Sequence, residues 1–408
     1  MQPSSRRRLS GVATAATLLG AALVLSGCAS DAGGAAKPSS SGASQVKITL
    51  ANDGSKDVCT LDHSSAPAGP ITFTIANESS TGITEVELMS DQRIIGEKEN
   101  LAPGLKPVSF TLTLGGGKYS VYCPGADKQN QDFTVTGKAA APKTGSVQTL
   151  LKQGSTQYAG YVDDQLAGMV TGVTALKTAI DAGDVAAAQK AYGQARPFYE
   201  RIESDVDGFV LPGTKANDNA GNLDYLIDMR ASNLDSAVGW HGFHAIERDL
   251  FQAGAITDGT KQLATELQKN VTTLAGLAKT LNYKPEDLAN GAAGLLEEVQ
   301  SSKIKGEEEA YSHLDLVDFA ANVEGSQQAF EYLKPGLTKI DSSLTAQIST
   351  QFDKVNALLG SYRDPSAIGG YVTYTPALRA SDANTLSQAV QALQDPLSLL
   401  AEKVATAQ

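Results

Sequence analysis

The sequence predicts a multi-domain fold in which an N-terminal β-sandwich is followed by an all-α domain built from helical bundles. Between residues 46 and 135, apolar and polar residues alternate at every second position in short segments, which is typical of half-buried strands. Beyond residue 146 the apolar residues recur at spacings of three and four, as on the buried face of a helix. An aperiodic stretch containing a proline separates the two regions and is interpreted as a linker.

The β region contains several short alternating segments separated by clusters of Gly and Pro, a pattern that indicates a sandwich. These segments are residues 46–52, 71–79, 83–90, 108–114, 118–123 and 132–137. We expect a signal peptide, a flexible tether, the sandwich, the linker and the all-α domain at residues 1–27, 28–45, 46–137, 138–146 and 147–408.

The all-α region carries apolar stripes that are interrupted by Gly and Pro, the residues that commonly end helices. We expect helices over residues 158–180, 185–206, 223–250, 261–281, 286–304, 310–333, 344–362 and 381–405. The simplest architecture for such a series is one or two helical bundles.

The N-terminus predicts export and lipid anchoring. Arg6, Arg7 and Arg8 precede an apolar stretch over residues 11–25, which is shorter than the roughly 20 residues of a membrane-spanning helix. Leu25-Ser26-Gly27-Cys28 then reads as a lipobox, followed by a Ser- and Gly-rich tether. We expect lipidation of Cys28 and a location on the outer face of the cytoplasmic membrane, the periplasmic side in a cell with two membranes. The alternative is an ordinary cleaved signal with an incidental cysteine.

The charge argues against nucleic acid as a partner. The formal net charge is −12, and removing residues 1–27, which hold three arginines and no acidic residue, changes it to −15. An acidic protein without a basic patch is a poor polyanion binder.

The cysteines leave two alternatives for the sandwich. If Cys28 carries lipid, only Cys59 and Cys123 remain. In an oxidising compartment they are expected to form a disulfide and so to lie close together. A redox or copper-handling role as thiolates is the other alternative. A blue-copper site is not expected, because the region has a single histidine, His63.

Candidate metal ligands occur at helical spacing in the all-α domain. His244 and Glu247 are three residues apart, as are Glu200 and Glu203, so each pair shares one helical face. Imidazole with carboxylates suits iron, zinc or manganese, and Asp315 is a candidate for a further ligand. The alternative for His244 and Glu247 is a hydrogen-bonded pair on a solvated face.

Two other patterns are interpreted without a metal. The run Glu307-Glu308-Glu309 follows Gly306 and is interpreted as acidic compensation of a helix start. The inverted metalloprotease pattern His-x-x-Glu-His fails because Arg248 stands where its second histidine belongs. Peptidase activity is therefore not expected.

Several stretches together resemble the EfeO family over residues 46–405. In the β region they are residues 59–79 (CTLDHSSAPAGPITFTIANES), 84–104 (TEVELMSDQRIIGEKENLAPG) and 119–125 (YSVYCPG). In the helical region they are residues 195–203 (ARPFYERIE), 242–251 (GFHAIERDLF) and 301–333 (SSKIKGEEEAYSHLDLVDFAANVEGSQQAFEYL). The resemblance implies a cupredoxin-like sandwich followed by an imelysin-like all-α domain.

The resemblance also implies a function and a set of sites. It implies an iron-binding component of an Efe-type ferrous iron uptake system, acting with a membrane iron permease and a haem-containing peroxidase, and needing no organic cofactor. Copper or zinc are further metals to consider. The family's His-x-x-Glu maps onto His244 and Glu247, and its Glu-bearing helix onto Glu200 and Glu203. Its proposed β-domain metal positions map onto Cys59, Glu85, Glu97 and Cys123. The alternatives are a metallopeptidase-like or a copper-handling surface lipoprotein.

Overall fold

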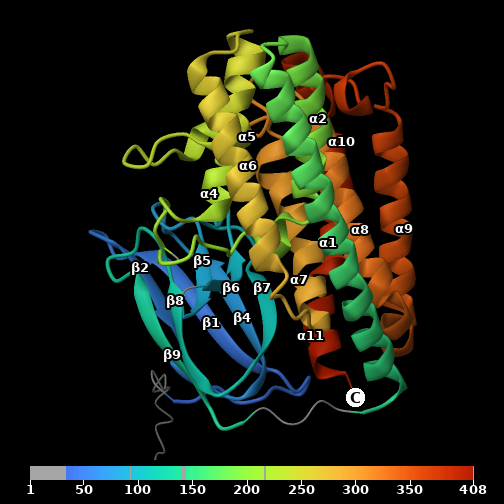
Figure 1. Ribbon diagram of the computed structural model, residues 1–408. Helices are drawn as coiled ribbons and strands as arrows, with labels where there is room; N and C mark the ends of the chain where they lie inside the picture. Colours follow the sequence, from blue (N-terminus) through green and yellow to red (C-terminus); the bar gives the residue numbers. More distant parts are fainter. Residues whose placement is uncertain (1–33, 92, 139–143, 216, 408) are drawn as a thin grey trace, which may run out of the picture. The chain divides into compact units, whose positions relative to one another are not determined.

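The computed structural model describes residues 34–91, 93–138, 144–215 and 217–407 (Figure 1). The predicted signal peptide, the lipidation residue Cys28 and residues 139–143 of the predicted linker lie outside the described residues. The described elements belong to one unit, Gly33–Gln408.

The N-terminal strands form two sheets, with strand orders β2-β1-β4-β7 and β3-β9-β8-β5-β6. Their bounds are β1 Ser44–Asn52, β2 Asp57–Leu61, β3 Ser65–Pro67, β4 Gly69–Asn77, β5 Val86–Ser90, β6 Arg93–Lys98, β7 Val108–Leu114, β8 Gly117–Tyr122 and β9 Asn130–Thr136. The pairs β1/β4 and β3/β9 are parallel, and the other pairs are antiparallel.

Aromatic residues fill the space between the two sheets. The ring of Phe73 lies 5.2 Å from that of Phe110 and also 5.2 Å from that of Phe133. Phe133 comes from the sheet that does not contain the other two. Cys59 on β2 and Cys123, directly after β8, form a disulfide with Cα atoms 6.4 Å apart. The bridge therefore joins the two sheets covalently.

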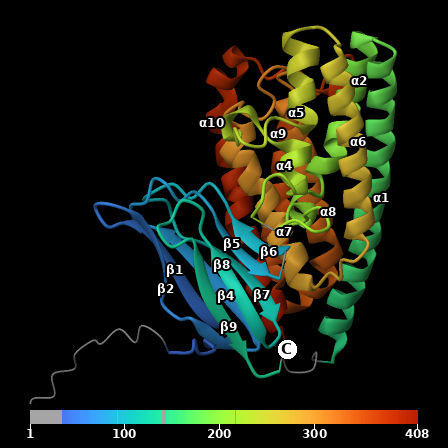
Figure 2. The ribbon, with the colours of Figure 1, turned by 60° about the vertical axis from the view of Figure 1, so that its left-hand side comes forward.

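The rest of the described chain is helical (Figures 1 and 2). The α-helices are α1 Ser146–Asp181, α2 Val185–Glu200, α3 Glu203–Val206, α4 Leu223–Asp228, α5 Gly242–Glu247, α6 Asp258–Ala278, α7 Pro285–Glu298, α8 Asp315–Ile340, α9 Ser342–Gly360, α10 Pro376–Leu397 and α11 Leu400–Thr406. Short 3-10 turns are η1 Ala231–Asn233 and η4 Ile368–Gly370, and π-helical turns are η2 Arg248–Gln252 and η3 Val299–Lys303.

Helix α1 packs along α2, α6 and α8, and its buried residues, which include Leu166, Met169 and Val173, form the stripe that the sequence predicts. The β-rich region followed by all-α structure confirms the predicted fold class. Among the described residues, no helix combines the length and the apolar character needed to cross a membrane.

The predicted helix over residues 223–250 is wrong. The chain forms the short helices α4 and α5 with a loop between them. Two glycines in this stretch, Gly239 and Gly242, adopt φ of 95° and 78°, a left-handed conformation that interrupts a right-handed helix. The apolar residues keep helical spacing within α4 and within α5, so the stripe alone did not reveal the break.

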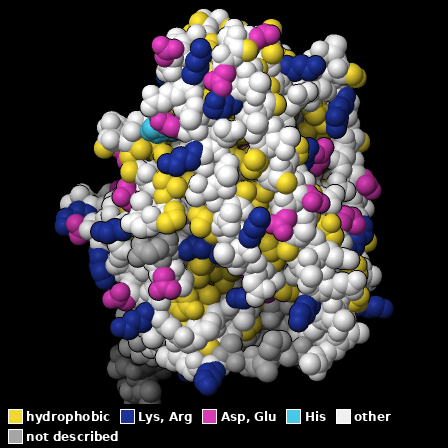
Figure 3. All heavy atoms as spheres, viewed as in Figure 1, with side chains coloured by type: hydrophobic (Ala, Val, Ile, Leu, Met, Phe, Trp, Pro, Cys, Tyr) yellow, Lys and Arg dark blue, Asp and Glu magenta, His cyan; other side chains and the backbone are white. Residues whose placement is uncertain are grey.

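Side chains of α7 hold the sandwich against the helices. Asn290 donates to the carbonyl of Thr111 at 2.8 Å and accepts the Thr111 N–H at 3.3 Å. Lys98 on β6 contacts both carboxylate oxygens of Glu297 at 2.8 Å. Lys98 is 5% exposed, so this ion pair is shielded from water. On the face shown in Figure 3, acidic and basic side chains are interspersed.

Candidate metal centre

The centre is built around His244, in the middle of α5. The helix begins at Gly242, whose φ of 78° and close approach to α4 both require glycine, since a Cβ there would lie 2.1 Å from the carbonyl oxygen of Ile227. This close packing brings α5 against α4, which ends at Asp228.

Both ring nitrogens of His244 face carboxylates, and the side chain is 1% exposed. Nδ1 lies 3.3 Å from Oε2 of Glu247 and 3.8 Å from Oε1 of Glu309. Nε2 lies 3.4 Å from Oε1 of Glu308 and 3.7 Å from Oδ1 of Asp228. The predicted pairing of His244 with Glu247 is therefore present, but it is buried rather than on a solvated face.

Glu247 fixes the loop that brings in the distant carboxylates. Its Oε1 accepts the backbone N–H groups of Tyr311 and Ser312, each at 2.7 Å. These residues lie in the segment between η3 and α8 that also carries Glu308 and Glu309. The opposite oxygen of Glu247 faces His244, so one carboxylate anchors the loop and contacts the imidazole.

Two sets of side chains have the spacing of metal ligands. One is Asp228, His244 and Glu308, and the other is His244, Glu247 and Glu309, with the donor atoms of each set within 4.8 Å of one another. Imidazole with carboxylates is a donor set that suits iron, zinc or manganese. All five residues are buried, so a bound ion would be largely shielded from water.

Buried cations balance part of this negative charge. Arg196 is 1% exposed and contacts Glu200 at 2.5 Å, Glu308 at 2.8 Å and Asp228. Lys303 is equally buried and lies 3.0 Å from Glu200 and 3.6 Å from Glu308. Buried carboxyl groups nevertheless outnumber the cationic side chains; they are Glu200, Asp228, Glu247, Glu308, Glu309, Asp315 and Asp318.

The predicted convergence of Glu200 and Glu203 on His244 is not found. Lys303 lies between them and the other carboxylates, 3.0 Å from Glu200 and 3.9 Å from Glu203. Asp315 accepts the N–H of Glu309 at 3.3 Å, and its other oxygen is buried without a hydrogen-bond partner among the described residues. None of these three residues contacts the imidazole. Glu200 contacts Arg196 and Lys303 instead, and Glu203 lies near Lys303.

The pKa values follow from burial and from the network. Burial and Arg196 lower the pKa of His244, but Glu247, Glu308 and Glu309 outweigh them and raise it to about 9. Burial raises the pKa of Glu308, but Lys303, Arg230 and other positive neighbours outweigh it and hold the pKa well below its usual range. Without metal, His244 therefore carries a proton near neutral pH, which a metal ion must displace.

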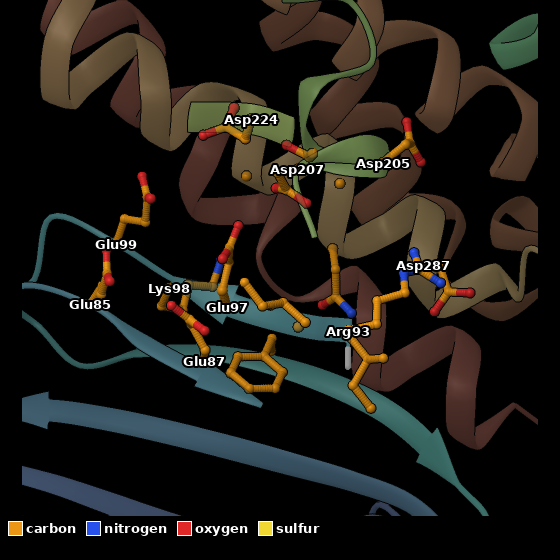
Figure 4. Close-up of a pocket in the computed structure, with 18 of the residues that line it drawn as sticks. Glu85, Glu87, Arg93, Glu97, Lys98, Glu99, Asp205, Asp207, Asp224 and Asp287 are labelled. Carbon is orange, nitrogen blue, oxygen red and sulfur yellow. The ribbon is translucent and has the colours of Figure 1, made fainter. Parts of the chain in front are cut away.

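The predicted ligand set of the β domain is divided in the structure. Cys59 and Cys123 are bonded to each other, so neither sulfur is available as a thiolate while the bridge is closed. Glu85 and Glu97 instead line a cavity of about 650 Å³ between the sandwich and the helices (Figure 4), to which neither cysteine contributes. Of the two alternatives for these cysteines, the structure therefore has the disulfide and not the pair of thiolates.

Sequence reasoning missed several residues of the centre. Glu308 and Glu309 belong to the run interpreted as helix-start compensation, which is wrong because α8 begins only at Asp315 and both glutamates are buried before it. Asp228, Arg196 and Lys303 were not singled out. Lys303 ends a buried π-helical turn, a geometry that is frequent at functional sites but that only the structure shows.

Arg248 occupies the position where a metallopeptidase would need its second histidine. Its guanidinium contacts Asp249 at 2.8 Å and lies 5.1 Å from the ring of Trp240. It is thus engaged at the surface and supplies no metal ligand.

Comparisons with known proteins agree with this architecture. The imelysin family model matches residues 154–400. The iron uptake system component EfeO of Escherichia coli (strain K12) is 34% identical over 360 residues, covering 87% of this chain and 90% of that protein. An Efem/EfeO family lipoprotein of Staphylococcus haemolyticus (strain JCSC1435) is 36% identical over 294 residues, covering 71% of this chain and 97% of that protein. The chain therefore belongs to the imelysin family and, within it, to the EfeO family.

Proposed function

We propose that this protein is the extracytoplasmic iron-binding component of an Efe-type ferrous iron uptake system. The observation that carries the proposal is the position of His244, which is buried with carboxylate oxygens of Glu247 and Glu308 within 3.4 Å of its two ring nitrogens. The names of the relatives, which describe iron uptake components, support the same role.

In this proposal His244 and Glu247 are direct ligands, and carboxylates from Asp228, Glu308 and Glu309 complete the shell. Glu200 and Glu203 act indirectly, because they hold Lys303, whose charge in turn orients Glu308. Asp315 acts indirectly through the backbone of Glu309. Iron is then cargo. A buried centre with more carboxylates than cationic side chains can bind a cation. It can release that cation again when the proton on His244 and the charges of Arg196 and Lys303 balance the carboxylates.

The role proposed here is binding and delivery rather than catalysis. A hydrolytic centre needs a coordination position open to water and a general base. Here the imidazole is enclosed by carboxylates that already contact Arg196 or the backbone. Iron fits this role better than zinc or copper because the relatives are named for iron uptake.

The anchor and the partners belong to the same proposal. Lipidated Cys28 would tether the protein to the outer face of the cytoplasmic membrane, as the name of the staphylococcal lipoprotein supports. Iron would pass from there to a membrane permease, with a haem-containing peroxidase as a further component. The names of the relatives, which describe a component of a system, are consistent with such partners.

The test measures iron on the purified mature protein. Anaerobic ferrous iron and ferric citrate should each raise the melting temperature through preferential binding to the folded state. His244→Ala and Glu247→Gln should abolish the shift and the bound iron. The matched control is His241→Ala, because His241 also pairs with a glutamate, at 3.1 Å from Glu266, but its side chain is 27% exposed. Equal iron binding by His244→Ala and His241→Ala would overturn the proposal.

A further inference from the structure

Lys303 is fully buried in the helical region, although lysine is almost never fully buried unless its charge is paired. Its Nζ faces one carboxylate oxygen from each of three glutamates. These are Oε2 of Glu200 at 3.0 Å, Oε2 of Glu308 at 3.6 Å and Oε2 of Glu203 at 3.9 Å. We call the place of Nζ among these three carboxylates the ammonium position. Several carboxylate oxygens around one small cation are also the surroundings that hard metal ions prefer.

The contacts in the ammonium position have the distances of ion pairs but not the directions of hydrogen bonds. Among the described residues, Nζ of Lys303 and both carboxylate oxygens of Glu200 are buried without a hydrogen-bond partner. An ammonium group has three N–H donors, which need acceptors in suitable directions. The surroundings of Nζ therefore compensate a positive charge but do not fit the hydrogen bonds of an ammonium group.

Glu308 links the ammonium position to the proposed metal centre. Its Oε1 lies 3.4 Å from Nε2 of His244, whereas its Oε2 faces Nζ of Lys303. One carboxylate thus presents one oxygen to each of two cation positions. Helical proteins build two-metal centres from glutamates and histidines that project inward from different helices, and the two ions of such centres are close neighbours. The arrangement around Glu308 resembles a two-metal centre in which an ammonium group takes the place of one ion.

The two arginines that contact Glu308 do not stand in for a metal ion in this way. Arg230 contacts Oε2 at 3.2 Å, but it also pairs with Glu298 at 3.0 Å and is 17% exposed. Arg196 contacts Oε1 at 2.8 Å and is shared with further carboxylates. A guanidinium is a wide planar group, whereas an ammonium is a compact point charge. Lys303 is therefore the cation that a metal ion can replace most directly.

We propose that Lys303 is a built-in cation that fills the second position of a two-cation centre and so limits this centre to one metal ion, at His244. The inference rests on the proposed metal binding at His244 and adds the residue that sets how many ions the centre holds. A fixed ammonium repels a second metal ion from the ammonium position. It also stays in place when the metal ion leaves, so Glu200 and Glu308 keep a counter-charge in the empty centre.

The test counts manganese(II) ions on the full mature chain, because carboxylate oxygens suit this metal and its bound ions are paramagnetic. Lys303→Met keeps the length of the side chain and removes its charge. At saturation in equilibrium dialysis, this variant should bind one manganese ion more than the parent binds. Its electron paramagnetic resonance spectrum should show two magnetically coupled ions, because Glu308 then bridges them. The parent's spectrum should lack this coupling.

Two control variants separate the ammonium position from a general loss of charge. Lys303→Met combined with Glu200→Gln removes a carboxylate from the opened position, so the ion count should return to that of the parent. Lys177→Met removes a lysine that is 22% exposed and pairs with Asp181, and it should leave the count unchanged. Metal-free Lys303→Met should melt at a lower temperature than the parent. Saturating manganese should raise its melting temperature by more than that of the parent, because the added ion binds the folded state and supplies the missing charge.

Two outcomes would overturn the proposal. One is a folded Lys303→Met protein with the ion count and the spectrum of the parent. The other is a variant that stays unfolded both with and without manganese, because a metal ion then does not replace the ammonium group. The proposed function fails on a different result, which is iron binding that His244→Ala leaves unchanged in a protein with Lys303 intact. Failure of this inference and failure of the proposed function are therefore distinguishable.

Discussion

Arg196 and His244 approach the same atom, Oε1 of Glu308. Nη2 of the arginine lies 2.8 Å from that oxygen and Nε2 of the histidine lies 3.4 Å from it, and none of the three side chains is more than 2% exposed. The guanidinium therefore orients the carboxylate that the imidazole also contacts. The permanent positive charge of Arg196 thus positions one of the carboxylates of the proposed metal centre.

Removing that cation should destabilise the metal-free protein strongly. Arg196→Met removes the counter-ion of buried Asp318 and one of the cations that contact Glu200 and Glu308, and breaking a buried ion pair in this way costs about 3–5 kcal/mol. Urea unfolding of the metal-free protein measures the loss, and Arg196→Lys should recover part of it. The control is Arg201→Met, because Arg201 pairs with Glu324 at 2.9 Å but is 25% exposed, so its removal should cost at most about 1 kcal/mol. Equal losses in the two methionine variants would contradict this account.

The glycine that begins α5 should be needed for both stability and metal binding. Gly242→Ala would place a Cβ 2.1 Å from the Ile227 carbonyl and force α5 away from α4. Gly254→Ala is the matched control, since Gly254 has φ of 60° but open space around its Cβ position.

We expect Gly254→Ala to cost about 1–2 kcal/mol from backbone strain alone. Gly242→Ala should cost about 1–3 kcal/mol more, because of the clash, and should also weaken the iron-dependent thermal shift. If Gly242→Ala retained the full shift, the position of α5 would not matter for binding.

The Cys59–Cys123 bridge should stabilise the sandwich substantially. It joins residues separated by 64 positions, for which the chain-entropy model gives about 4 kcal/mol. Cys59→Ser with Cys123→Ser should lower the free energy of unfolding by an amount of that order while leaving iron bound at His244 unaffected. The mass of the non-reduced protein should be lower than the mass of the reduced protein by two hydrogen atoms. Alkylation of both cysteines without prior reduction would exclude the bridge.

Asp205 should make stability depend on pH. It accepts a hydrogen bond from Tyr158 at 2.6 Å. Burial raises the pKa of Asp205 to about 7 from an ordinary 3.8; Asp207 and Asp287 also raise it, while Tyr158 and Arg93 lower it. Because the folded state then binds more protons than the unfolded state between about pH 4 and 7, this group makes stability fall as pH rises through that window, by up to about 1.4 kcal/mol per pH unit.

Asp205→Asn keeps an acceptor for the Tyr158 hydroxyl and cannot ionise, so it should flatten the pH dependence of unfolding in that window. Asp164→Asn, at an exposed position of α1, should leave the parent's slope. If Asp205→Asn left the pH dependence of the free energy of unfolding unchanged, that dependence would come from other buried carboxyl groups.

Lipidation should depend on Cys28. Cys28→Ser removes the thiol that receives the lipid, so the variant should appear in the soluble extracellular fraction or remain unprocessed. Radiolabelled palmitate and N-terminal analysis measure the two outcomes. A processed variant that stays in the membrane fraction would contradict the lipobox interpretation.

Local patterns of the sequence determined much of the fold and one pair of residues in the proposed metal centre, His244 and Glu247. Alternation at every second residue identified β1, β4, β5, β7, β8 and β9, whereas β2, β3 and β6 were missed. Helical spacing placed His244 and Glu247 on one face, because residues three apart meet within one turn. These are relations between neighbours in the chain, and they need no knowledge of the rest of the fold.

Only the tertiary structure decided what surrounds that pair. Asp228, Glu308 and Glu309 come from segments far apart in the chain, and Glu308 and Glu309 looked like surface charges at a helix start. The sequence analysis predicts that Glu200 and Glu203 bind a metal ion. In the structure the cationic side chains of Arg196 and Lys303 contact Glu200 instead. The physical reason is that a buried carboxylate must find a counter-charge, and which proton, side chain or ion supplies it depends on distances that exist only after the helices have packed.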